Sequence, residues 1–284
     1  MLFLILSIIC SVTVGVIFKI ARNYQISTTQ IVAFNYAFAL ILCYLFFSPD
    51  LTILDTSSPW SVFVSLGILL PSVFLFLAAS IKYMGIVKTD AAQRLSLIIS
   101  ILGAWFIFEE QFNTFKLIAL LIGFPALLLI LNKSTENKES KWIYPAIVLV
   151  GFGVIDLLFK QIALNSSVSF TTSLFVIFSI SLLIMVAYNC YELFSGKVKM
   201  NFKSIIFGGL VGIFNFGNIL FYLKAHKAFA ENPSTVFAGM NMGVIVIGTL
   251  VGVLVFKEKI TKWNVIGLLL ALLAIVFIVA AQLK

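Results

Sequence analysis

An aspartate and a lysine lie inside an otherwise apolar segment near the middle of the chain. Asp156 and Lys160 are four residues apart in the segment 142–164, so they share one face if the segment is helical. In a bilayer, an ionised carboxylate at that depth costs about 2.5 to 3.5 kcal/mol on the insertion scale and therefore needs a partner. Two uses stay open: a solute or coupling proton that contacts Asp156, or a structural ion pair with Lys160.

Two further polar stripes interrupt apolar segments. In 204–225 the stripe has spacings of three and four, and in 89–108 Gln93 begins a row that continues with Ser96 and Ser100. Arg94, beside that row, either faces a cavity or extends to the membrane surface, with Asp90 four residues earlier as its partner. The residues that we expect to bind a solute or coupling ion are Asp156, Lys160, Asn215, Asn218, Tyr222, Gln93 and Arg94.

Other kinds of site are not indicated. The lone histidine, His226, lies among lysines, and the three cysteines share no metal or redox spacing. The sequence has no His-Asp spacing suited to acyl transfer and no Gly-rich phosphate loop. We therefore expect no catalytic residue, no metal site and no cofactor.

Composition indicates that lipid surrounds the chain. Hydrophobic residues make up 62% of the 284 residues, charged residues 11%, and the mean hydropathy is +1.14. A soluble domain of this length has too little interior to bury so much apolar surface. The net charge of +8 does not indicate nucleic acid, because Lys and Arg lie at the edges of apolar runs. We expect a multi-pass integral protein of the cell membrane.

Apolar runs of about 20 residues, the length that crosses a bilayer as a helix, predict the architecture. Short loops separate them, and a β-barrel is excluded because the runs do not alternate in polarity. Glycine pairs four apart, such as Gly208/Gly212 and Gly248/Gly252, favour close helix contacts. The predicted fold class is an all-α membrane protein with ten transmembrane helices near 2–21, 28–47, 60–81, 89–108, 115–132, 142–164, 170–191, 204–225, 234–256 and 263–282.

An internal repeat divides these helices into two sets of five. Four matches occur in order: Phe18-Lys19 with Phe159-Lys160, Thr28-Thr29 with Thr171-Thr172, Lys82 with Lys227, and Glu110 with Glu258. Because five is odd, the second set must be inverted relative to the first. We expect one repeat at 1–132, a loop at 133–141 and a second repeat at 142–284.

The repeat also bears on Asp156, since its counterpart in the first half is Gly15. Lys19, the counterpart of Lys160, therefore has no carboxylate on its own helix; the alternative interpretation is that its ammonium group reaches water unaided. A carboxylate needed only to neutralise a lysine should occur in both halves. The asymmetry favours a ligand or proton role for Asp156.

Ten helices in two halves, with Phe108-Glu109-Glu110 and Lys257-Glu258 closing the fourth helix of each half, resemble the EamA-like branch of the drug/metabolite transporter superfamily. A Gly-Glu pair is typical there, and the Gly is missing in both halves. The resemblance implies a secondary carrier of small organic metabolites, often an exporter, with a central cavity and peripheral fifth and tenth helices.

We therefore expect a transporter, not an enzyme, which moves a small organic metabolite by alternating access and is an exporter. A coupling proton is a second expected partner. Two alternatives stay open: a translocase of lipid or lipid-linked sugar, and a membrane-integral transferase acting on lipid.

Orientation has two conflicting predictors. Of the 19 Lys and Arg residues, 14 lie in or near the odd-numbered loops, which makes those loops cytoplasmic and puts both termini outside. The resemblance implies termini inside. We follow the charge count, because it acts on this chain.

Overall fold

A computed structural model describes residues 1–24, 26–108, 114–131, 141–164, 168–229 and 233–282. Within these ranges the regular structure is entirely helical, as predicted. A short 3-10 turn, Arg22–Tyr24, follows the first helix, and a π-helix, η2 (Val251–Val255), follows the tenth. The α-helices are α1 (Leu2–Ala21), α2 (Thr28–Phe47), α3 (Trp60–Met84), α4 (Ile86–Leu95), α5 (Leu97–Phe108), α6 (Thr114–Leu131), α7 (Ile143–Leu164), α8 (Phe170–Phe194), α9 (Phe202–Ala228), α10 (Pro233–Leu250) and α11 (Lys262–Gln282).

These helices form ten spans across the described part of the chain, because α4 and α5 follow one another as a single broken span. The sequence predicted one continuous helix at 89–108, so this detail was wrong. The span begins earlier, at Ile86, and is interrupted at Ser96, whose hydroxyl donates to the carbonyl oxygen of Gln93 at 2.6 Å. A serine hydroxyl that bonds nearby backbone competes with helical hydrogen bonding, which accounts for a break that hydropathy does not reveal.

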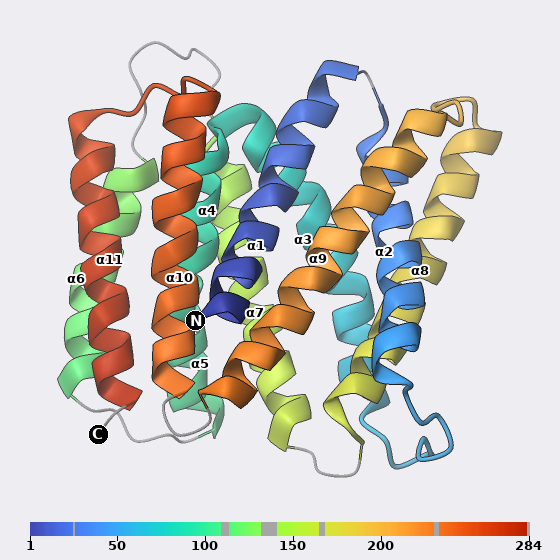
Figure 1. Cartoon of the computed structure of the whole chain (residues 1–284), viewed down its shortest axis with the longest axis horizontal. Helices are drawn as coiled ribbons and strands as arrows, with labels where there is room; N and C mark the ends of the chain where they lie inside the picture. Colours follow the sequence, from blue (N-terminus) through green and yellow to red (C-terminus); the bar gives the residue numbers. More distant parts are fainter. Residues whose placement is uncertain (25, 109–113, 132–140, 165–167, 230–232, 283–284) are drawn as a thin grey trace.

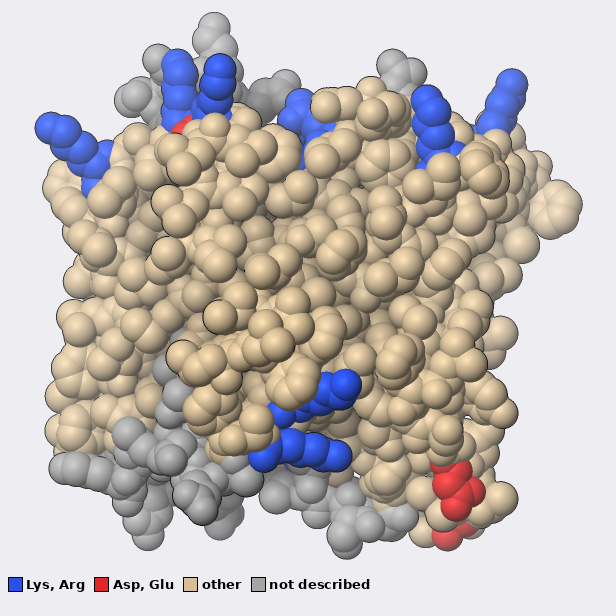
Figure 2. All heavy atoms as spheres, viewed as in Figure 1, with Lys and Arg blue, Asp and Glu red and all other residues tan. Residues whose placement is uncertain are grey.

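In the described segments, seven helices are long and apolar enough to cross a membrane. Two further apolar helices there are shorter. The protein is therefore a multi-pass integral membrane protein. Figure 2 shows a broad surface with few charged side chains, and most of the visible Lys and Arg side chains are gathered along one end of the molecule. We call this the lysine-rich end; Lys19, Lys82 and Lys259 lie there.

Corresponding helices of the two halves make corresponding contacts. The helix α1 packs on α9 as α7 packs on α3, and the pairs α6/α11 and α2/α8 lie at opposite edges of the bundle (Figure 1). In the same view α1 runs toward the lysine-rich end and α7 runs away from it. The arrangement is that of two inverted five-helix repeats. The loop expected at 133–141 lies almost wholly outside the described residues, and its boundaries stay a prediction.

Glycines bring helices of the two halves close together, as the spacing predicted. A Cβ atom at Gly212 on α9 would lie 2.7 Å from the carbonyl oxygen of Asn35 on α2. A Cβ at Gly248 would lie 2.3 Å from the Asp90 carboxylate, and one at Gly252 would lie 2.6 Å from Val87. Since real Cβ atoms do not approach so closely, α9 lies against α2, and α10 with η2 against α4, only because these residues lack side chains.

Candidate functional site

A cavity of about 760 Å³ lies between the two repeats. Its lining reaches the end of α7 and the start of α8, where Lys160 and Phe170 lie, away from the lysine-rich end, and we call this part its mouth. The wall is mainly apolar, with Phe152 and Leu157 among its residues, and polar side chains are set into it. Six of the seven predicted site residues line this cavity: Gln93, Arg94, Asp156, Lys160, Asn218 and Tyr222.

Arg94 faces the cavity from the last turn of α4 and does not extend to the membrane surface. Its Nη2 donates to the hydroxyl of Ser11 on α1 at 2.9 Å, while its Nε is buried without a hydrogen-bond partner. The expected partner, Asp90, exerts an electrostatic attraction but makes no ion pair within 4.0 Å in the described structure. The guanidinium therefore keeps an unsatisfied donor within the protein interior, close to the cavity.

Asp156 faces Arg94 from the other half of the molecule. Its Oδ2 accepts a hydrogen bond from Ser100 on α5 at 3.0 Å, and the charge of Arg94 acts on the carboxylate. Among the described residues Asp156 makes no ion pair with Lys160, so the structural pairing considered above is wrong. The reason is the close approach of α7 to α5, where a Cβ at Gly103 would lie 2.3 Å from Leu157; this brings Ser100 to the carboxylate.

The stripe on α9 divides between two environments. Asn218 lines the cavity, and its side-chain oxygen accepts from Ser7 on α1 at 2.8 Å. Tyr222 also lines it, one turn further along the helix. Asn215 instead donates to Asn35 on α2 at 3.2 Å and belongs to the α2/α9 contact. Asn215 is only about 20° around the helix from Tyr222, so the difference is its position along the axis: it lies about 4.5 Å nearer the start of α9 than Asn218, where the helix contacts α2.

Sequence reasoning missed the contribution of α1. Ser7 and Ser11 bind Asn218 and Arg94, so a helix of the first half positions a side chain from each half. Their spacing of four on an otherwise apolar helix is the signal that could have identified them. Asn241 on α10 also lines the cavity.

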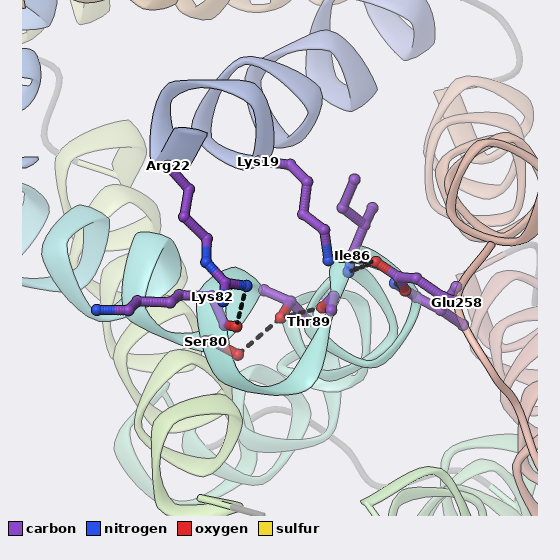
Figure 3. A network of polar contacts seen from close by, with 9 residues as sticks. Lys19, Arg22, Ser80, Lys82, Ile86, Thr89 and Glu258 are labelled. Atoms are coloured by element: carbon purple, nitrogen blue, oxygen red, sulfur yellow. Dashed lines mark hydrogen bonds and ion pairs between the residues drawn. The ribbon is translucent and has the colours of Figure 1, made fainter. Parts of the chain in front are cut away.

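A second polar cluster lies at the lysine-rich end, around a pocket of about 400 Å³. Figure 3 shows Glu258, which follows η2, directed at the start of α4. Its Oε1 accepts from Lys19 Nζ at 3.0 Å, so Lys19 has a carboxylate partner and the alternative that it reaches water unaided was wrong. The partner comes from the other repeat instead of from the same helix. The contrast with Gly15 therefore no longer argues for a role of Asp156, which depends on the cavity alone.

A helical protein that crosses the membrane many times, with a cavity between inverted repeats that polar side chains enter, has the construction of a membrane transporter of small molecules. Comparison with known proteins specifies the class. Residues 1–132 match the EamA-like transporter family, and the chain belongs to that family, within the drug/metabolite transporter superfamily. Members of this family are transporters and not enzymes.

Two further comparisons agree with a single architecture along the whole chain. A protein of Haemophilus influenzae (strain ATCC 51907 / DSM 11121 / KW20 / Rd), described as uncharacterized, is 43% identical over 282 residues, spanning 96% of this chain and 95% of its own. A solved crystal structure of another protein matches 100% of this chain and 98% of its own, with a TM-score of 0.62 at 13% identity. The second likeness supports the fold alone.

Proposed function

We propose that this protein is a secondary transporter that exports a small organic metabolite across the cell membrane by alternating access, with the 760 Å³ cavity as its solute site. The observation that carries the proposal is the pair of opposite charges inside that cavity. Arg94 belongs to the first repeat and Asp156 to the second, so a solute held between them contacts both halves. When the two repeats move relative to one another, the contacts of such a solute change.

The cavity fits a small solute in size and chemistry. Sites for small molecules commonly have volumes of about 300 to 1,000 Å³, with apolar walls and few polar groups. The buried Nε of Arg94 has no partner, and an unmade hydrogen bond of that kind costs about 1 to 3 kcal/mol. A solute group that accepts from Arg94 recovers this free energy. The proposal therefore assigns an acceptor, such as a carboxylate or a carbonyl, to the solute.

Asp156 is the proposed coupling residue. It is half-buried, lines the cavity and accepts from a neutral hydroxyl, so it can hold a proton without losing a structural ion pair. In a proton-coupled carrier, such a carboxylate binds a proton from one side of the membrane and releases it to the other. Gln93, Asn218, Tyr222 and Lys160 supply the remaining polar contacts in this proposal.

The charge pattern sets which side of the membrane the cavity faces in this conformation, and export is the direction that we propose. The positive-inside rule makes the lysine-rich end cytoplasmic. The cavity then opens to the outside, and the solute is released on that side. A proton entering from outside would reach Asp156 in this conformation, which suits exchange of an outgoing solute for an incoming proton.

The deciding experiment is a transport assay with purified protein in liposomes. Liposomes loaded with single classes of metabolite, with and without a pH gradient, are expected to release one class faster when protons are supplied from outside. Movement of a fluorescent lipid between leaflets, with no solute transport, would support a lipid translocase. Chemical modification of lipid would instead replace the carrier by a membrane-integral transferase.

A further inference from the structure

The carboxylate of Glu258 occupies the first turn of α4, a helix of the other repeat (Figure 3). Oε1 accepts from the backbone N–H of Ile86 at 2.7 Å, and Oε2 accepts from the N–H of Val87 at 3.1 Å. The ammonium group of Lys19 on α1 adds a third donor. We call Lys19, Glu258 and these two backbone groups the interrepeat latch.

The helix α4 has no N-terminal cap of its own. Only Gly85 separates it from α3, and a glycine has no side chain with which to accept from the first N–H groups. Those groups carry the positive end of the helix dipole and need an acceptor. Glu258 supplies a charged acceptor from the opposite repeat, a stronger partner than a neutral cap.

The backbone on both sides is shaped to admit this carboxylate. Gly85 has φ +86°, and a Cβ there would lie 2.5 Å from Glu258 Oε2. On the other side, η2 is a π-helix and the next turn contains Lys257 at φ 52°. Irregular backbone of this kind is unfavourable by itself and concentrates where function requires it. Here both irregular segments end at one interaction between the repeats.

The latch lies at the end of the molecule opposite the mouth of the cavity. Between the two, Gly248 and Gly252 hold α10 and η2 directly against α4, which continues to Arg94. The lysine-rich end is therefore closed in this structure, while the cavity reaches the other end. Opening the lysine-rich end requires α4 and α1 to separate from η2, and this breaks every contact of the latch.

We propose that the interrepeat latch is a conformational lock, in which Glu258 stabilises the state closed at the lysine-rich end and leaves the start of α4 when that end opens. An interaction present in only one of two states shifts their populations when it is removed. This inference concerns the two conformations of the chain and does not depend on which solute is carried.

The contacts predict that Glu258 contributes more to the latch than Lys19. Glu258→Gln removes the charge that faces three donors, whereas Lys19→Gln leaves the carboxylate on Ile86 and Val87. We expect the closed-to-open ratio to fall about fivefold in Glu258→Gln, the effect of losing a charged helix cap, and less in Lys19→Gln. Exchanging the two residues should not restore the ratio, because an ammonium group at position 258 cannot accept from the α4 amides.

Distances between spin labels measure these populations in the full chain in lipid nanodiscs. The background carries Cys10→Ser, Cys43→Ala and Cys190→Ser, so that only introduced cysteines react. Lys82→Cys with Lys259→Cys reports the lysine-rich end, and Lys116→Cys with Leu223→Cys reports the mouth of the cavity. In Glu258→Gln we expect the first distance to lengthen and the second to shorten in the same fraction of molecules.

Lys262→Gln is the matched control, since it removes an exposed positive charge at the start of α11 outside the latch. It should leave both distances at their background values. Unchanged distances in Glu258→Gln, or lengthening at both ends, would overturn the proposal. If Glu258→Gln does not yield monodisperse protein, Glu258→Asp is judged by the same criteria, because its shorter side chain cannot reach all three donors.

Discussion

At the residue scale, two opposite charges line the cavity, and side chains of neighbouring helices hold each of them. Arg94 and Asp156 stand out because charges are rare in apolar segments, and both line the cavity. Their partners, Ser11 and Ser100, come from other helices, so no local spacing could reveal them. The i, i+4 rule offered Asp90 and Lys160 instead. That rule describes proximity along one helix and is overridden when a neighbouring helix lies closer.

Asp156→Asn tests the coupling role. The amide has the same shape and is cheaper to bury, so the protein should fold and insert normally. Transport driven by a pH gradient should fall by about tenfold or more, corresponding to the loss of a charged interaction of about 1.5 kcal/mol or more. Rates are measured in liposomes with the gradient present and absent. Ser100→Ala, which keeps the carboxylate, should retain the gradient dependence; wild-type rates and pH dependence in Asp156→Asn would show that the residue is structural.

Arg94→Gln tests solute binding. Removing the guanidinium withdraws a charged donor from the cavity, and we expect the apparent affinity for the transported solute to fall by about tenfold to 100-fold. Stability should not fall, because a half-buried charge without an ion pair is replaced by a neutral amide. Affinity and thermal stability are measured on the same preparation. Lower stability with unchanged affinity would assign Arg94 to the fold.

At the scale of helices, hydropathy and length located the spans, and the structure differs in where they break. The interruption at Ser96 and the π-helix before Glu258 both lie in the fourth span of a repeat. Each depends on a specific polar contact, Ser96 with Gln93 or Glu258 with α4. An apolar run does not encode such contacts. They replace a few backbone hydrogen bonds of the helix by side-chain hydrogen bonds, and the burial of the segment stays the same.

Glycine contacts between helices give a prediction about stability. In Gly212→Ala the new methyl group would lie 2.7 Å from both Asn35 O and Phe38 Cβ, so α2 and α9 must separate. Overpacking of this kind costs about 1 to 3 kcal/mol, which exceeds the better helix propensity of alanine. We expect a lower melting temperature in detergent. Gly15→Ala is the control, since its methyl group meets atoms no closer than 3.8 Å and should leave the melting temperature unchanged or higher.

At the scale of the whole molecule, the inverted repeat follows from the count of spans, and the contacts of the two halves mirror one another. The symmetry does not extend to the two ends. One end is closed by glycine contacts and the latch, and the cavity reaches the other. A single sequence predicts the two symmetric halves, because it contains the internal repeat. It does not predict which of two related conformations the chain adopts, since both use the same helices.

The distribution of lysines predicts how the molecule sits in the membrane. Carrying Lys and Arg across the bilayer during insertion is unfavourable, and cytoplasmic anionic lipids attract them, so the lysine-rich end should be cytoplasmic. Because α1 runs toward that end and α11 runs away from it, both termini should lie outside (Figure 1). The resemblance noted above implies the opposite orientation. The experiment therefore decides between the physical argument from charge and the evolutionary argument from family resemblance.

A fluorescent protein that matures only in the cytoplasm, fused after Lys284, should remain dark in cells. The same reporter fused after Gly196, in the connection between α8 and α9 at the lysine-rich end, should fluoresce and is the matched control. Alkaline phosphatase, which is active only outside the cytoplasm, should give the reverse result at both positions. A bright fusion at Lys284 would contradict the charge argument, and the cavity of this structure would then face the cytoplasm.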